Sequence, residues 1–247
     1  MKFYILFLFL LLTACGSRPT HDGGGYVYKK LSDEEAKKLV TPTIYYIASF
    51  DQRNLQCAVE VRRQMKAQSG AILAIVCPEV YKSCVLQGTC RLQINAGTML
   101  LNVSEKIDGE YRFKNLSNSQ CRFGHGPTKD SAQSFKLMCL DPYYSVAADL
   151  SIYNLGDVIY IPIFAGLKMS NGQTHDGYFI VRDSGTNIKG YGRFDFFLGD
   201  SDSVVDRQNF LKLGLKDKNT HFTYFLAEKN EAGKVLLERN FPYLPNH

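Results

Sequence analysis

The sequence has no apolar run long enough to cross a bilayer, no CxxC pair, no internal repeat and no clustered basic segment. The apolar run near the start ends at Leu12, about half the ~20 residues that a membrane-spanning helix needs. The formal net charge is only +5 and is dispersed, which argues against nucleic-acid binding and allows attraction to an anionic wall polymer.

Residues 1–14 have the features of a bacterial export signal: a single charge at Lys2, a short apolar stretch, and small residues before a cleavage point. The ending Leu12-Thr13-Ala14-Cys15 resembles a lipobox. That resemblance implies that Cys15 is lipidated and becomes the mature N-terminus, so the chain would be held on a membrane by a lipid. Ordinary signal cleavage nearby is the alternative.

Residues 15–40 read as the lipidated N-terminus followed by a tether that contains Gly23-Gly24-Gly25. Gly16 stands where an aspartate usually retains a lipoprotein at the inner membrane. We therefore expect a lipid-anchored protein on the periplasmic side of the outer membrane.

Six cysteines follow Cys15, all of them before residue 140. An even count in an exported chain favours disulfides, although the sequence does not choose among the possible pairings. The five histidines do not sit at zinc-ligand spacing near these cysteines, so we expect no metal site and no cofactor. The six are Cys57, Cys77, Cys84, Cys90, Cys121 and Cys139.

The remainder, residues 41–247, is expected to form a single mainly β domain with few short helices. Short branched and aromatic runs recur at intervals near ten residues, which is typical of a barrel or sandwich. The continuous apolar run 71–77 should be a strand buried on both faces, and 55–66 could be helix or strand. The other expected strands are 43–47, 90–94, 99–103, 111–113, 145–149, 158–163, 178–181, 193–197 and 223–226.

Aspartates and glycines are concentrated in residues 142–199, within the segments His175-Asp176-Gly177, Asp183-Ser184-Gly185, Lys189-Gly190 and Arg193-Phe194-Asp195-Phe196. This block resembles the 3D domain, named for three aspartates, which occurs in membrane-bound lytic transglycosylase A and other exported wall proteins. The close match covers roughly a quarter of the chain. Ser184-Gly185-Thr186-Asn187 departs from the usual glycine-glycine-alanine turn but leaves the three carboxylates in place.

The resemblance implies a six-stranded double-psi β-barrel with Asp176, Asp183 and Asp195 grouped at one mouth as the catalytic set. It assigns the role of catalytic acid to Asp195. The disulfide-containing stretch at about 50–140 would be an insertion that lengthens or decorates the groove. Residues expected to bind substrate are His175, Tyr178, Lys189 and Tyr45, with glycan strands of peptidoglycan as the partner and the protein acting as a monomer.

The chemistry of the residues agrees with this assignment. Cleaving a glycosidic bond requires a carboxyl group that stays protonated at the working pH, and neighbouring carboxylates or burial raise a carboxyl pKa. A lytic transglycosylase then needs no second carboxylate and no water, because the muramic acid C6 hydroxyl closes a 1,6-anhydro ring. The alternative function is a non-catalytic, expansin-like glycan-binding wall protein, and a third possibility is a hydrolase with two opposed carboxylates.

Overall fold

The computed structural model describes residues 33–127, 138–201, 204–215 and 220–245. The predicted export signal, the lipidation of Cys15 and most of the tether lie outside these residues. Within them the protein is mainly β with few short helices, as predicted. No helix in the described ranges is long and apolar enough to span a membrane.

The helices and strands follow one another along the chain with short connections. In order they are α1 (Asp33–Ala36), β1 (Leu39–Asp51), the 3-10 turn η1 (Val59–Val61), β2 (Arg63–Lys66), β3 (Ile72–Val76), α2 (Pro78–Gln87), β4 (Thr89–Ile94), β5 (Gly97–Ile107), β6 (Glu110–Asn115), β7 (Ser145–Ala147), β8 (Val158–Tyr160), η2 (Pro162–Phe164), β9 (Tyr178–Asp183), β10 (Arg193–Asp200), α3 (Val204–Lys212), β11 (Phe222–Thr223), β12 (Phe225–Leu226) and α4 (Lys229–Glu238).

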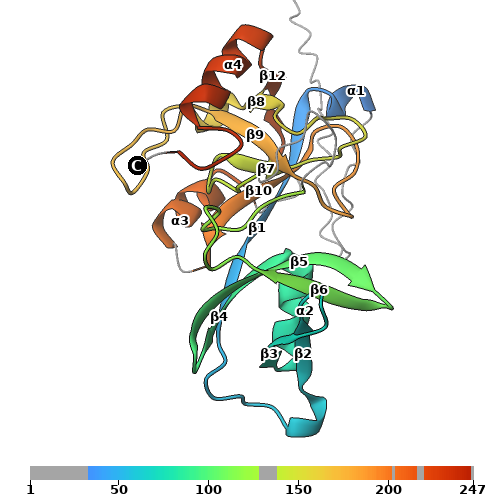
Figure 1. Ribbon diagram of the computed structural model, residues 1–247. Coiled ribbons are helices and arrows are strands. Elements are labelled where there is room, and N and C mark those ends of the chain that lie inside the picture. Colours follow the sequence, from blue (N-terminus) through green and yellow to red (C-terminus); the bar gives the residue numbers. More distant parts are fainter. Residues whose placement is uncertain (1–32, 128–137, 202–203, 216–219, 246–247) are drawn as a thin grey trace, which may run out of the picture.

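Strand β1 belongs to both halves of the molecule (Figure 1). Its residues from Thr41 to Ile47 pair in parallel with β10, and those from Ala48 to Asp51 pair in parallel with β4. We call the half that contains β7 to β12, α3 and α4 the aspartate half. The other half, which contains β2 to β6 and α2, is the disulfide half.

In the aspartate half the strand order is β12-β8-β9-β7-β10-β1, and β11 pairs with the start of β1. Its core is rich in phenylalanine, with edge-to-face and tilted ring contacts around Phe164. Burying each of these rings contributes about 1.5–3 kcal/mol, which anchors the short strands that bear the aspartates. The fully buried rings are Phe164, Phe179, Phe194, Phe196 and Phe210.

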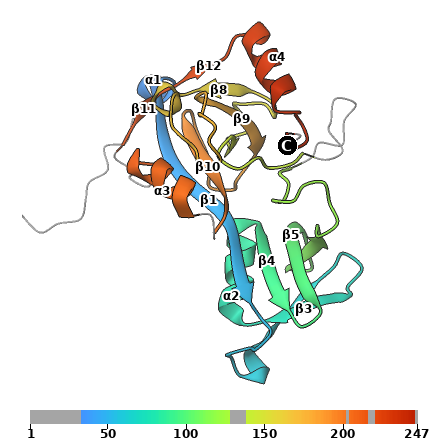
Figure 2. The same ribbon diagram turned by 90° about the vertical axis from the view of Figure 1, so that its left-hand side faces the viewer.

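In the disulfide half the strand order is β4-β5-β6-β2-β3, and α2 contacts β1, β4 and β5 (Figure 2). The predicted disulfides are confirmed by three bonds. Two of them lie within this half, and the third ties the segment that follows β6 to the chain that leads into β7. The pairs are Cys57–Cys77, Cys84–Cys90 and Cys121–Cys139.

Two details differ from the sequence-based expectations, and one open alternative is resolved. The 71–77 strand is not buried on both faces: β3 is an edge strand, so Ile72 and Ile75 are about half exposed. The ambiguous 55–66 stretch is η1 followed by β2. The aspartate half has more than the six predicted strands among the described residues, because the 223–226 run is split between β11 and β12. Double-psi closure stays a prediction.

Candidate functional site

Asp183 and Asp195 flank the short central strand β7. Ala147 of β7 is in register with Asp183 of β9 on one side and with Asp195 of β10 on the other. Neighbouring strands lie about 4.8 Å apart, so the two aspartates are two strand spacings from each other. The methyl side chain of Ala147 leaves the space between them open to the groove, which all three residues line.

Asp195 is held by the parallel pair β1–β10, in which it is the partner of Thr43. Thr43 Oγ1 donates a 2.6 Å hydrogen bond to Asp195 Oδ1 and accepts a 2.7 Å hydrogen bond from Arg193 Nη1. Burial raises the pKa of the Asp195 carboxyl, while the Thr43 hydrogen bond and the Arg193 charge oppose that rise. Among the described residues, nothing is hydrogen-bonded to Asp195 Oδ2, so this oxygen is available to a ligand in the groove.

Asp183, at the end of β9, uses both of its carboxylate oxygens. Oδ2 accepts a 3.0 Å hydrogen bond from the Tyr45 hydroxyl, and Oδ1 accepts one of 2.8 Å from the Ser184 backbone N–H. Burial raises the pKa of Asp183 to about 7, and the negative charge of Asp195 acts in the same direction. Near neutral pH this carboxyl therefore exists in both its protonated and ionised forms.

The groove in which the two carboxyls lie has a volume of about 570 Å³ and is lined by residues of both halves of the molecule. The aspartate half contributes the carboxyl groups and the 184–188 turn. The disulfide half contributes the turn after α2 and parts of β5 and β6, and the 125–127 segment, which pairs with Cys139, completes the lining. That this stretch is an insertion that lengthens or decorates a glycan groove stays a prediction. Polar side chains from the disulfide half and from the 125–127 segment are Gln87, Thr89, Asn102, Ser104, Tyr111, Lys114 and His125.

Asp176 does not line this groove. Its Oδ2 accepts a 2.7 Å hydrogen bond from Arg239, which follows α4, and its Oδ1 accepts one of 3.0 Å from the Tyr178 backbone N–H. The Arg239 guanidinium lies over the ring of Tyr144. The predicted grouping of three aspartates at one mouth is therefore a pair, with the third held apart in a separate ion-pair network.

His175 is fully buried and reaches no groove. Its Nδ1 accepts a hydrogen bond from Gly177 N–H and its Nε2 donates one to the carbonyl of Tyr143, each 2.9 Å long. Its ring stacks on Tyr144 at 4.4 Å. Burial lowers the pKa of His175 to about 4, so the ring is neutral and holds the backbone in place.

The other three residues expected to bind substrate are dispersed. Tyr45 lines the groove, and its ring lies tilted against that of Phe197 with the centroids 5.1 Å apart. Tyr178 donates its hydroxyl to Glu231 of α4, outside the groove, and that hydrogen bond raises its pKa to about 12. The ammonium of Lys189 is exposed and lies 3.5 Å from Asp149.

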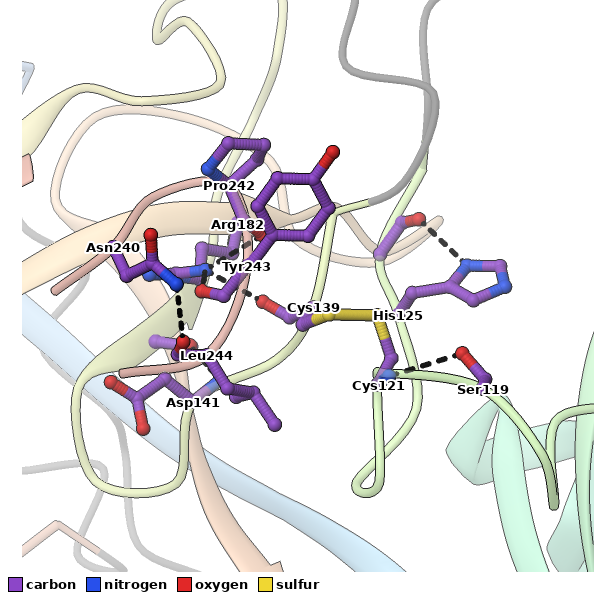
Figure 3. Close-up of a disulfide and its surroundings, with 12 residues drawn as sticks. Ser119, Cys121, His125, Cys139, Asp141, Arg182, Asn240, Pro242, Tyr243 and Leu244 are labelled. Carbon is purple, nitrogen blue, oxygen red and sulfur yellow. Dashed lines mark hydrogen bonds between the residues drawn. A yellow bond between two sulfur atoms is a disulfide. The ribbon is translucent and has the colours of Figure 1, made fainter. Parts of the chain in front are cut away.

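Arg182 precedes Asp183 in β9 and, by strand alternation, points away from the groove. Its guanidinium is fully buried and donates to the backbone carbonyls of Cys139, Pro242 and Tyr243 at 2.9–3.1 Å (Figure 3). Burial lowers its pKa to about 10, so it remains charged. Arg182 thereby fixes the C-terminal segment and the Cys121–Cys139 bond against the strand that presents Asp183.

Sequence reasoning did not select Thr43 and Arg193 as site residues. A signal was present, because residues two apart on a strand share a face and Arg193 is two residues from Asp195. Thr43 stands in the same relation to Tyr45. The sequence does not encode the β1–β10 register, which places Thr43 and Tyr45 beside Arg193 and Asp195. No group of His, Cys, Asp and Glu side chains with the proximity of a metal site occurs in the described part of the chain.

The fold and the site define a mainly β protein with a pair of aspartates in a groove that both halves line. Residues 144–211 match the family model described as the 3D domain, in agreement with the resemblance of the aspartate block. This segment includes all three aspartates. Comparison with curated proteins gives no match.

Solved structures similar to this one include lytic transglycosylases from three bacteria. E. coli MltA with bound chitohexaose has a TM-score of 0.46 at 14% identity, covering 77% of this chain and 73% of that chain. The membrane-bound lytic murein transglycosylase from Agrobacterium tumefaciens has a TM-score of 0.46 at 12% identity, covering 81% and 76%. LtgG of Burkholderia pseudomallei has a TM-score of 0.36 at 16% identity, covering 77% and 72%.

Proposed function

We propose that the protein is a peptidoglycan lytic transglycosylase that cleaves the bond between N-acetylmuramic acid and N-acetylglucosamine. The observation that carries the proposal is a half-buried Asp195 with one carboxylate oxygen free in an open groove, next to a second carboxyl of raised pKa. The 3D domain over residues 144–211 supports the same function.

In the first step protonated Asp195 donates its proton from Oδ2 to the glycosidic oxygen, and the bond from that oxygen to muramic acid C1 breaks. Thr43 holds Oδ1, which leaves Oδ2 as the oxygen that faces the groove. Burial supports this step by keeping a fraction of the carboxyl protonated at the working pH. The positive charge that develops at C1 is stabilised by carboxylate charge in the groove.

In the second step ionised Asp195 takes the proton of the muramic acid C6 hydroxyl while the C6 oxygen attacks C1. A 1,6-anhydro ring forms, Asp195 is again protonated, and no water is consumed. One residue thus acts as acid and then as base, which is why a partner carboxylate across the bond is not required.

Asp183 is a supporting group in this scheme. Both of its oxygens already accept hydrogen bonds, so it is less free than Asp195 to exchange a proton with the substrate. Its role is electrostatic: when ionised it favours the protonated form of Asp195 and then the developing positive charge at C1. Tyr45 holds its orientation.

Asp176 contributes in this proposal from outside the groove, by pairing with Arg239 and so holding α4 against the sheet. His175 likewise supports the backbone. The proposal keeps the lipid on Cys15 as the membrane anchor on the periplasmic side of the outer membrane, and glycan strands as the partner of a monomeric protein.

Digestion of purified sacculi tests the activity. The wild type should release muropeptides that end in 1,6-anhydromuramic acid, detected by mass spectrometry. Asp195→Asn should lower the rate about 10³-fold, because removing a general acid or base costs on the order of 10²–10⁴. Asp108→Asn, in the exposed turn between β5 and β6, is the matched control and should retain full activity.

Other products would overturn the proposal. A reducing muramic acid end would indicate a hydrolase. Retention on sacculi without any soluble product would indicate the expansin-like, non-catalytic alternative. Undiminished release of anhydro product by Asp195→Asn would remove that residue from the chemistry.

A further inference from the structure

Two basic side chains line the groove, Lys114 from the disulfide half and His125 from the segment that follows β6. Lys114, near the end of β6, lies directly opposite Asn102 of β5 in the antiparallel register. His125 belongs to the segment that forms a β-bridge with Cys139. Both line the groove that contains Asp183 and Asp195.

Neither basic group is neutralised within the described part of the chain. Lys114 is exposed and makes no ion pair there, and the carboxylates that line the groove from described residues are the two aspartates of the opposite half. Lys114 is close enough to His125 for its charge to add to the effect of burial and lower the pKa of that ring. Burial and the Lys114 charge favour the neutral form of His125, so Lys114 is the cation of the pair, and an anion beside it would supply the counterion that it lacks.

The ring of His125 offers a hydrogen-bond acceptor to the same site. Its Nδ1 lies 3.2 Å from the carbonyl oxygen of Gly126, and because a carbonyl only accepts, Nδ1 carries the proton (Figure 3). Nε2 of the neutral ring therefore presents a lone pair, and it has no hydrogen bond to any described residue. Lys114 supplies a cation and His125 supplies a hydrogen-bond acceptor. Together they fit a ligand in which a carboxylate, for Lys114, lies next to an amide N–H or a hydroxyl group, for His125.

We propose that Lys114 and His125 form a subsite for a carboxylate that the glycan carries on the lactyl ether of muramic acid. The carboxylate is either that of the lactyl group itself or one on the peptide attached to it. This inference rests on the proposed function, and it deepens it by naming a substrate feature. N-acetylglucosamine lacks the lactyl group, so the subsite distinguishes the two alternating sugars and sets which glycosidic bond faces Asp195.

Binding to three ligands tests the subsite, with Asp195→Asn as the parent so that no ligand is cleaved. Chitohexaose has no carboxylate, amidase-stripped glycan strands have the lactyl carboxylate, and intact strands have peptides. Lys114→Met should weaken binding of carboxylate-bearing strands about 3- to 5-fold, the size of a solvent-accessible ion pair, and leave chitohexaose unchanged. Lys114→Arg should retain the affinity.

Lys82→Met, an exposed lysine of α2 outside the groove, is the matched control and should change none of the three affinities. Loss confined to peptide-bearing strands assigns the peptide carboxylate, and equal loss on stripped strands assigns the lactyl carboxylate. An equal loss on chitohexaose, or no loss on any ligand, would overturn the subsite. Because binding is measured without turnover, absence of anhydro product from the wild type would refute the proposed activity alone.

Discussion

Thr43 and Asp195 are register partners in the parallel pair β1–β10, and the Thr43 hydroxyl donates a 2.6 Å hydrogen bond to Asp195 Oδ1. The same hydroxyl oxygen accepts from Arg193 Nη1. The Thr43 hydroxyl proton therefore points at the carboxylate. The Arg193 guanidinium lowers the pKa of Asp195 through its charge, and it also polarises the hydroxyl that donates to Asp195.

Thr43→Val keeps the shape of the side chain and removes its hydrogen bond. Because that bond stabilises the ionised form and lowers the pKa of Asp195, its loss should raise the pKa of Asp195 further. The acid then stays protonated to higher pH, so the alkaline limb of kcat against pH should move upward. Rates of anhydromuropeptide release across the pH range measure this. Thr98→Val, at an exposed position of β5, should leave the profile in place, and a downward shift for Thr43→Val would contradict the expectation.

Asp183 should make the protein less stable as pH rises. Its pKa is about 7 in the folded protein against an ordinary value of 3.8, so between these limits the native state binds more protons than the unfolded chain. The stabilising contribution is complete below about pH 4 and is lost as pH rises through about 7. Asp183→Asn cannot ionise, so its free energy of unfolding in urea should fall less between about pH 4.5 and pH 7.5. Asp108→Asn should follow the wild type, and parallel curves for Asp183→Asn would refute the burial effect.

Gly126 permits the 125–127 segment to approach the strand that presents Asp183. A Cβ added at this position would lie 1.9 Å from the carbonyl oxygen of Arg182 and 3.1 Å from the Cα of Asp183. Gly126→Ala should therefore displace the segment, lower the free energy of unfolding by about 1–3 kcal/mol, and raise KM for glycan strands. Gly233→Ala, in α4 with open space around it, should instead stabilise by about 0.5–1 kcal/mol with no change in KM. Equal behaviour of the two variants would contradict this packing.

The sequence predicted what depends on local pattern. Alternating and apolar runs placed most strands within a few residues, and the motifs of residues 142–199 supported the resemblance to the 3D domain. The helix α2 was not anticipated, because Pro78 favours a helix start only once the preceding strand is known to end at Val76. The exposure of Ile72 and Ile75 depends on β3 being an edge strand, which is a property of the sheet and not of the run itself.

The site residues, too, were predictable only where local sequence pattern decides their position. Asp183 and Asp195 meet because both are in register with Ala147, and no local pattern encodes that register. The resemblance implies that Asp176 is grouped with them, but Asp176 precedes the start of β9 and Asp183 is at its end, so the two lie at opposite ends of one strand. Partners that come from distant parts of the chain, such as Arg239 for Asp176 and Tyr45 for Asp183, could not be read from spacing.

Strand β1 bears on how a long polymer could use this groove. A hinge between two halves of a protein normally lies in loops. Here the connection is the strand β1, whose first part pairs with β10 and whose last part pairs with β4 (Figure 1). The Arg91–Asp200 ion pair, 2.8 Å long, adds a second link between β4 and β10. Opening the two halves would bend β1 where its partner changes from β10 to β4 and would separate Arg91 from Asp200. Under the proposed function, we therefore expect a glycan strand to enter the groove from its open side, without the two halves closing around it.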